Sequence, residues 1–420
     1  MISPLLPTRW RRTSLARLAI VLGAVALLAR WSLPRQRDTT PPGLPAPTRA
    51  LHLKLAPGVD AAVVGPLLDV AASAVLGPDA SARHDRVATR PLFPRPVGLL
   101  AADRAAASAR DGHPAPDHTR WWRGVVSATP TQLEEIVARL AIEPVIADVF
   151  VEPEVVLADL GAAPRPGGPT ARAGDACPVK TPSYEPYQGY LSASPDGIDA
   201  PTAWSRPGGR GEGVWFADVE GAWNARHEDL PGDRIQLVAG TPLDARSWDA
   251  HGTAVVGMIA ARDNGLGMVG IAPAIERVVT ASIGDIGAAA AIDGAQAALR
   301  PGDVLLIELQ GGGPRNRYIP VEYWQDVFDA VSLATGRGVI VVAAAGNGGE
   351  NLDHRIYRGA FDPRKRDSGA ILVGAGAPPR PGFRDRSRLD FSNFGARVDV
   401  QGWGRMVATL DYGDLQSCSG

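Results

Sequence analysis

The stretch Asp-Ala-His-Gly-Thr-Ala-Val-Val-Gly-Met-Ile-Ala-Ala, residues 249–261, places a histidine in front of a run of small and apolar residues. Such a run is too apolar for a surface helix, so we expect a buried helix over Thr253–Ala261. His251 would then lie at the mouth of this helix, where the first turn opens into a cleft. Taken alone, a histidine here is more often structural than functional. The segments around it change that interpretation.

Strands and helices alternate on both sides of the histidine segment. This alternation is typical of a parallel sheet with helices on both faces, so we predict an α/β domain over residues 191–420. The predicted strands are Gly213–Ala217, Ile275–Ala281, Val304–Leu309, Val339–Ala344 and Ile371–Ala375. The predicted helices between them are Thr253–Ala261, Ile286–Leu299 and Val321–Thr335.

A smaller α+β domain is predicted over residues 50–158. Leu51–Leu55 and Trp121–Val126 are typical of strands, and Val145–Val156 predicts a third. A helix begins at Thr129-Pro130, where threonine is a good cap and proline a good first residue, and ends at Leu140. The Ala/Arg-rich stretch 79–118 is interpreted as an insertion that is disordered or partly helical.

The N-terminus is typical of an export signal, because several arginines precede the apolar run Leu18–Ala29. The run is shorter than the roughly 20 residues that span a bilayer, so we expect a cleaved signal over residues 1–31 and a secreted protein, extracellular or periplasmic. An uncleaved membrane anchor is the alternative. Linkers are predicted at 32–49 and, with a processing region, at 159–190. The net charge of −2 argues against a nucleic-acid partner.

Two further segments follow predicted strands and carry polar groups. Asp218 ends the first strand, at the edge of a parallel sheet where active-site residues gather, and its carboxylate could orient an imidazole. Asn347 lies between Gly346 and Gly348 after the strand Val339–Ala344, where its amide could bind the oxyanion of a tetrahedral intermediate. A turn aspartate and an ordinary Gly-Asn-Gly turn are the alternatives for the two sites.

Together, in this order, Asp218, His251 in His-Gly-Thr and Asn347 in Ala-Ala-Ala-Gly-Asn resemble the subtilisin family of serine proteases. The segments 227–230, 270–273 and 391–404 fit the same family. The resemblance implies a subtilisin-like fold and a serine-type endopeptidase with a catalytic Asp218/His251/Ser triad and Asn347 in the oxyanion hole. It also implies an extended polypeptide substrate, a monomer, and no cofactor for the chemistry.

The resemblance assigns further parts of the chain. The glycine-rich edge would pair with the substrate backbone through Glu308, Leu309, Gln310, Gly311, Gly312 and Gly313. Residues 50–158 resemble the family's propeptide, a partner domain that caps the cleft of a zymogen. Asp229 and Asn264 lie near positions that bind calcium in some members, so a structural Ca²⁺ ion is predicted there.

The expected nucleophile is missing from the sequence as written. Family members continue into a Gly-Thr-Ser segment, whereas this chain reads Ser417-Cys-Ser419-Gly420 at its end. We expect little or no hydrolysis from such a chain. Three interpretations are open: a truncated active protease, a non-catalytic peptide-binding pseudoprotease, or a substitute nucleophile at Ser419. A small-molecule hydrolase is disfavoured, because the sequence contains no G-x-S-x-G motif. Pairing of Cys177 with Cys418 cannot be deduced from spacing.

Overall fold

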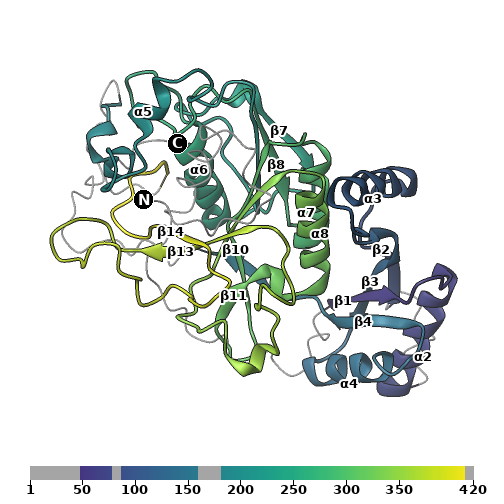
Figure 1. Ribbon diagram of the computed structural model, residues 1–420. Helices are drawn as coiled ribbons and strands as arrows, with labels where there is room; N and C mark the ends of the chain where they lie inside the picture. The colour runs from purple at the N-terminus through teal and green to yellow at the C-terminus, as the bar shows by residue number, and fades with distance from the viewer. Residues whose placement is uncertain (1–47, 78–86, 159–180, 412–420) are drawn as a thin grey trace, which may run out of the picture.

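The computed structural model describes residues 48–77, 87–158 and 181–411, which form a large α/β domain and a small α+β domain side by side (Figure 1). The apolar run Leu18–Ala29, both cysteines and Ser417–Gly420 lie outside these residues. Among the described helices, none combines the length and the apolar character needed to cross a membrane.

A seven-stranded sheet forms the centre of the large domain. Its strands run parallel in the order β14-β13-β12-β9-β6-β8-β7. Their bounds are β6 Trp215–Glu220, β7 Ile235–Ala239, β8 Arg277–Ser282, β9 Val304–Ile307, β12 Ile340–Ala344, β13 Ile371–Gly376 and β14 Val400–Trp403. The predicted parallel sheet is thus confirmed. The two unpredicted strands, β7 and β14, form its edges, where partial exposure weakens the apolar pattern.

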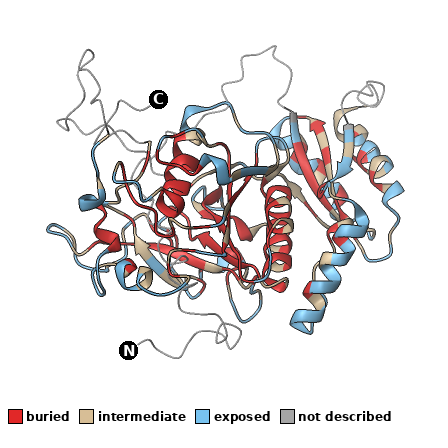
Figure 2. Cartoon of the chain, turned by 90° about the horizontal axis from the view of Figure 1, so that it is seen from above, coloured by how far each residue is buried: buried red, intermediate tan, exposed pale blue. Residues whose placement is uncertain are grey.

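Helices cover both faces of this sheet. On one face α6 (Arg246–Ala260) packs into an apolar core with α5 (Ala200–Trp204), and on the other face lie α7 (Gly287–Ala297) and α8 (Gln325–Gly336). Burial colouring shows the interior helices and strands of this domain largely red (Figure 2). Helix α6 begins at Arg246, seven residues before the predicted start, so His251 lies inside the helix rather than at its mouth.

The small domain is a four-stranded antiparallel sheet in the order β2-β3-β1-β4, with two helices packed on one face. Its elements are β1 Thr48–Leu55, α2 Val64–Leu76, β2 Val87–Pro91, α3 Val97–Asp111, β3 Trp121–Ser127, α4 Pro130–Leu140 and β4 Ile146–Val151. The predicted cap of α4 is confirmed, since Thr129 and Gln132 form a capping box. In the described part of 79–118 the partly helical alternative is confirmed by α3. The segment is not an insertion, because β2 pairs with β3 and Leu100 and Ala107 of α3 are buried.

The second face of the small sheet lies against α7 and α8 of the large domain, and its polar contacts are mostly charged. His52 Nδ1 lies 2.7 Å from Asp326 Oδ2, with both side chains buried, and Lys54 Nζ lies 2.5 Å from Asp329 Oδ2. Trp121 donates its indole N–H to the same Asp329 at 2.8 Å. Further pairs are Arg95 with Asp293, His118 with Asp293 and Arg337 with Asp103. Most of the cations come from the small domain and most of the carboxylates from the large one.

The His52 contact predicts that docking of the small domain depends on pH. Burial lowers the pKa of His52, but Asp326 and Glu152 together outweigh it and raise the pKa from 6.5 to about 9. The protonated form therefore stabilises the folded chain, fully below pH 6.5, and this contribution of roughly 3 kcal/mol is lost as the pH rises through 9.

Chemical denaturation of the wild type and of His52→Gln checks this expectation. The difference in unfolding free energy between them should be largest near pH 6 and shrink toward pH 10. His113→Gln, which changes an exposed histidine of the same domain, should change the unfolding free energy only slightly. A His52→Gln difference that stays constant from pH 6 to pH 10 would refute the linkage.

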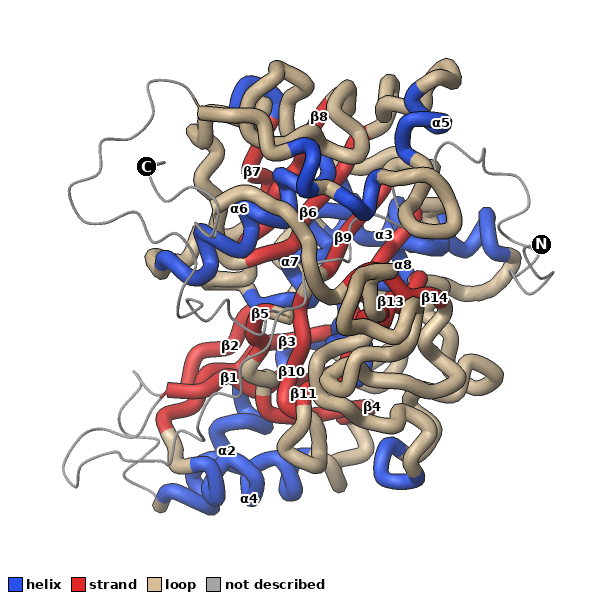
Figure 3. The backbone as a smooth tube through the Cα atoms, turned by 90° about the vertical axis from the view of Figure 1, so that its left-hand side faces the viewer, coloured by secondary structure: helices blue, strands red, loops and turns tan. Residues whose placement is uncertain are grey.

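A short third sheet joins the two domains. Strand β10 (Leu309–Gly312) pairs antiparallel with β11 (Tyr318–Pro320) on one side and with β5 (Val155–Leu157) on the other. Figure 3 shows β5, β10 and β11 in the same region of the molecule as strands β1, β2 and β3. The predicted strand Val145–Val156 is therefore two strands, β4 and β5, which belong to different sheets. The end of the small domain thus lies as an added strand on the large one.

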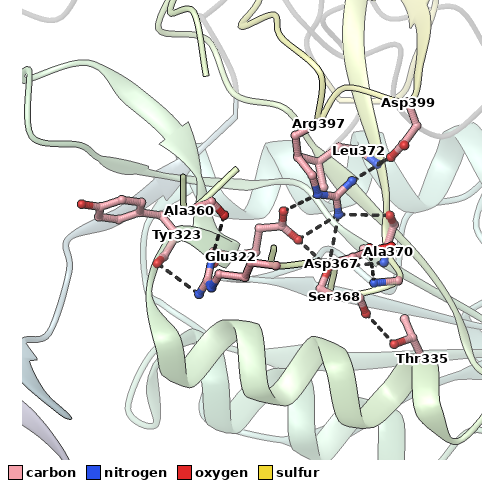
Figure 4. Close-up of polar contacts among 12 residues, drawn as sticks. Glu322, Tyr323, Thr335, Ala360, Asp367, Ser368, Ala370, Leu372, Arg397 and Asp399 are labelled. Atoms are coloured by element: carbon pink, nitrogen blue, oxygen red, sulfur yellow. Dashed lines mark hydrogen bonds and ion pairs between the residues drawn. The ribbon is translucent and has the colours of Figure 1, made fainter. Parts of the chain in front are cut away.

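A buried ion pair anchors the segment in front of α8 (Figure 4). Arg397 donates to both carboxylate oxygens of Glu322, at 2.7 and 3.0 Å, and also to Ser368 and to the carbonyl of Ala370. Glu322 accepts a further bond of 2.6 Å from the Ser368 hydroxyl. The side chains of Glu322 and Arg397 are 4% and 2% exposed, so neither charge can be satisfied by water if the other is removed.

Arg397→Ala is expected to lower the unfolding free energy by about 3–5 kcal/mol, because it leaves the Glu322 carboxylate buried without its cation. The denaturant midpoint measures this loss. Arg364→Ala, which breaks an exposed pair with Asp362, should leave the midpoint almost unchanged. A double substitution, Arg397→Met with Glu322→Leu, should recover much of the loss, since it removes both charges. Equal midpoints for Arg397→Ala and Arg364→Ala would contradict the prediction.

Candidate active site

His251 lies in α6 with its imidazole fully buried, and a carboxylate holds one of its ring nitrogens. Glu220 Oε1 lies 2.8 Å from His251 Nδ1, and both side chains are 0% exposed. A close approach of the chain allows this arrangement. A Cβ on the neighbouring Gly252 would lie 2.2 Å from the Ala222 carbonyl oxygen, so only glycine lets the loop after β6 lie against the helix. A carboxylate on Nδ1 fixes the imidazole tautomer and leaves Nε2 for chemistry.

The contact expected of Asp218 is therefore made by Glu220. Strand β6 runs three residues beyond its predicted end, so Glu220 and not Asp218 lies at its carboxyl end. The two side chains lie on the same face of the strand because successive residues alternate. Asp218 Oδ2 instead accepts a bond of 2.7 Å from the Trp223 indole. Burial, followed by the nearby Glu220, raises the pKa of Asp218 well above its usual value.

A third carboxylate, Glu308, lies on the other side of the imidazole. Its Oε2 atom is 3.9 Å from His251 Nε2, and its side chain is 2% exposed. Sequence reasoning expected Glu308 to contribute only its backbone to substrate pairing. The residue directly follows β9, so the same rule that favoured Asp218 could have identified it: acidic residues at the carboxyl ends of parallel strands meet at one edge of the sheet.

A strand of the same chain, β5, pairs with the predicted substrate-binding residues of β10. Leu309 pairs with Leu157, Gln310 with Val156, and Gly311 with Val155. The Glu308 carbonyl accepts a bond of 3.0 Å from the Ala158 N–H, and the Gln310 amide donates to the Leu157 carbonyl at 2.7 Å. The other two residues of the predicted set lie beyond this pairing: Gly312 opposes Tyr318 of β11, and Gly313 bonds to Arg317 in the turn.

Asn347 holds the end of this added strand. Its side-chain Nδ2 donates a bond of 2.7 Å to the Ala158 carbonyl oxygen, and its backbone N–H donates to Gln310 Oε1 at 2.8 Å. Gly346 has a φ of 87°, a left-handed conformation that glycine adopts without strain and that turns the chain just after β12. Asn347 thus donates its side-chain amide to a backbone carbonyl, which is the kind of contact that an oxyanion donor makes.

The predicted calcium residues lie together, but protein groups already bond to their oxygens. Asp229 Oδ1 accepts from the Asn264 amide at 3.1 Å and Oδ2 accepts from the Met268 N–H at 2.9 Å. The Asn264 oxygen accepts from Leu266. No group of three or more His, Cys, Asp or Glu side chains with metal-binding geometry occurs among the described residues. This arrangement does not resemble the six to eight oxygens that Ca²⁺ takes, and the ion stays a prediction.

Known proteins match the part of the chain that contains His251, Glu308 and Asn347. Residues 232–408 match the model of the subtilase family. The chain is 31% identical over 206 residues to subtilisin Savinase of Lederbergia lenta, covering 48% of this chain and 68% of that protein. It is 28% identical over 239 residues to an intracellular serine protease of Paenibacillus polymyxa, covering 53% of this chain and 66% of the relative.

Several solved structures of subtilisin-like proteins also match. Fervidolysin from Fervidobacterium pennivorans, a keratinolytic enzyme related to subtilisin, aligns with 91% of this chain and 49% of its own, at 18% identity and a TM-score of 0.46. The epidermin leader peptide processing protease of Staphylococcus aureus aligns with 85% of this chain and 75% of its own, at 13% identity and a TM-score of 0.44. On its sequence match to subtilisin Savinase and to the family model, the chain belongs to the subtilase family of serine proteases.

Proposed function

We propose that this protein is the precursor of a secreted endopeptidase that hydrolyses peptide bonds by acyl transfer through a Glu220/His251/Ser triad. One observation carries the proposal: the Ala158 carbonyl accepts a bond from Asn347 Nδ2 at 2.7 Å, while the Ala158 N–H is held by Glu308 at 3.0 Å. A residue whose N–H and carbonyl are both held by hydrogen bonds is positioned as the residue before the cleaved bond of a substrate would be.

Each group has a defined role in the proposed reaction. Glu220 holds Nδ1–H of His251, so Nε2 is the nitrogen that takes the proton of an attacking serine hydroxyl. The serine oxygen bonds to the carbonyl carbon, and Asn347 stabilises the oxyanion. His251 then gives its proton to the leaving amine, and water hydrolyses the acyl-enzyme by the same steps. The predicted approach to the serine, Ser417–Gly420, lies outside the described residues.

The small domain acts in this proposal as a propeptide that fills the cleft. Its last described segment, Val155–Ala158, lies along β10 as an extended strand in contact with the substrate-binding residues. The bond that follows the gripped carbonyl is Ala158–Asp159, which is therefore the proposed processing site. The expected linker 159–190 would give the new N-terminus length to move away.

The N-terminal sequence of the secreted protein tests the proposal. The protein, expressed for export, should yield a processed species that begins at Asp159. His251→Ala should accumulate the unprocessed chain, and Arg364→Ala, which changes an exposed residue paired with Asp362, should process normally. A processed species from the His251→Ala variant in a protease-deficient host would show that another enzyme cuts the chain.

A non-catalytic peptide-binding protein is the second candidate, because strand addition to β10 needs no nucleophile. A serine-directed phosphonate separates the two proposals. Covalent labelling that depends on His251 supports the enzyme, whereas an unlabelled protein that retains peptide binding supports the binder.

A further inference from the structure

The Ala158 side chain fills a pocket that is made of apolar side chains. It is 0% exposed and packs against Ala344 and Ala375, with Leu389 and Phe391 partly buried against the same cluster. Ala344 ends β12 and Ala375 belongs to the neighbouring β13, so the floor of the pocket is the sheet itself. The walls come from the loop that follows β13.

Hydrogen bonds hold these walls in place. The Leu389 N–H donates to the Ala375 carbonyl at 3.0 Å, and the Phe391 carbonyl accepts from the Gly349 N–H at 2.7 Å. The Ser392 hydroxyl accepts from the Ala375 N–H at 2.8 Å, which fastens the loop to β13 a second time. A larger side chain in place of the alanine would have to displace Leu389 or Phe391 against these bonds, and overpacking of this kind is unfavourable.

The neighbouring positions of the added strand are less restricted. Val155, Val156 and Leu157 are all partly exposed, whereas Ala158 is completely buried. The side-chain size is therefore restricted at the residue whose carbonyl accepts the hydrogen bond from Asn347. An apolar pocket discriminates mainly through the space that it offers, with factors of roughly 10 to 200 for each added or missing methylene.

We propose that this site accepts alanine-sized residues immediately before the scissile bond, and that Phe391 and Leu389 set this limit. The inference rests on the proposed function only in assuming that the bond after this residue is cleaved. The size limit itself concerns binding and does not depend on cleavage. The substrate class is thus polypeptides with a small apolar residue, such as alanine, at that position. The side chains of Leu389 and Phe391 exclude a bulky aromatic residue. Replacing one of them by alanine should allow such a residue to bind.

Hydrogen exchange of the full-length chain tests the size limit without catalysis. In the wild type, those amides of Val155–Ala158 that bond to β10, such as the Ala158 amide, should be protected. Ala158→Phe should raise their exchange rates at least 10-fold, and Phe391→Ala added to Ala158→Phe should restore most of the protection. Glu154→Phe places the same bulk at an exposed position of the segment and should leave the protection unchanged. Amides of β12 report whether each variant is folded.

Two results would overturn the proposal: wild-type protection in Ala158→Phe, or a loss that neither Phe391→Ala nor Leu389→Ala reverses in a folded protein. The processed enzyme gives a second measurement. Its kcat/KM should be at least 100-fold higher for a peptide with alanine than with phenylalanine before the cleaved bond, and Phe391→Ala should narrow that ratio. Turnover without size preference would refute the pocket and leave the proposed function standing. Protection without any turnover would refute the function and leave the pocket standing.

Discussion

Glu220→Gln is expected to slow processing of the chain at Ala158 by about 10⁴-fold. A glutamine can offer its NH₂ group to His251 Nδ1 and so favour the wrong tautomer, with the proton on Nε2. It also removes the negative charge that stabilises the imidazolium at 2.8 Å. The time course of conversion from precursor to processed form, followed on gels, measures the rate within one chain.

Asp218→Asn is the matched control for this prediction, because both changes replace a buried carboxyl by an amide on the same face of β6. The raised pKa of Asp218 means that its carboxyl resists ionisation, so a neutral amide is a close replacement for it. We expect a much smaller loss from Asp218→Asn. A larger loss from Asp218→Asn than from Glu220→Gln would return the orienting role to Asp218.

Asn347→Leu is expected to lower kcat by about 10²–10³-fold, which corresponds to roughly 2.7–4 kcal/mol of transition-state stabilisation. Leucine keeps the approximate shape of the side chain but removes the Nδ2 donor that now bonds to the Ala158 carbonyl. An oxyanion carries more charge than a ground-state carbonyl, so KM should change far less than kcat. Steady-state kinetics of the processed enzyme on a peptide substrate measure both.

The same variant also separates catalysis from binding. If Asn347 only positions the substrate, Asn347→Leu should raise KM and leave kcat unchanged, and this result would contradict its assignment to the oxyanion. Gln310→Leu removes the donor to the Leu157 carbonyl and also the acceptor of the Asn347 N–H. Its effect should therefore fall on both KM and kcat.

Patterns that repeat along the chain predicted most of the fold. The alternation of apolar strands and helices predicted the parallel sheet, and the capping residues Thr129 and Pro130 marked the start of α4 correctly. The region around α3 failed because its sequence has little apolar periodicity. It folds against α8 through buried Leu100 and Ala107, a contact between segments that lie more than 200 residues apart.

Site residues could be predicted where the residue type is unusual for its surroundings. They could not be predicted where two similar residues lie close together on the same strand. A histidine in an apolar helix and an asparagine between glycines each pointed to chemistry. Asp218 and Glu220 are two acids on one strand, and the choice depended on where that strand ends, which propensities do not fix to within two residues. The place of Ala158 in the cleft depends on long-range pairing of β5 with β10, which no local pattern reveals.

The added strand β5 also determines how the site would respond to other peptides. While β5 is covalently joined to the large domain, it competes from within the same molecule, at an effective concentration that short linkers place near the millimolar range. A peptide in solution must exceed that concentration, or bind more tightly, to displace it. One cut after Ala158 ends this advantage, because the released segment dilutes into the surrounding solvent once it leaves. The proposed processing step would thus turn a permanently occupied cleft into one whose occupancy follows the concentration and affinity of its ligands.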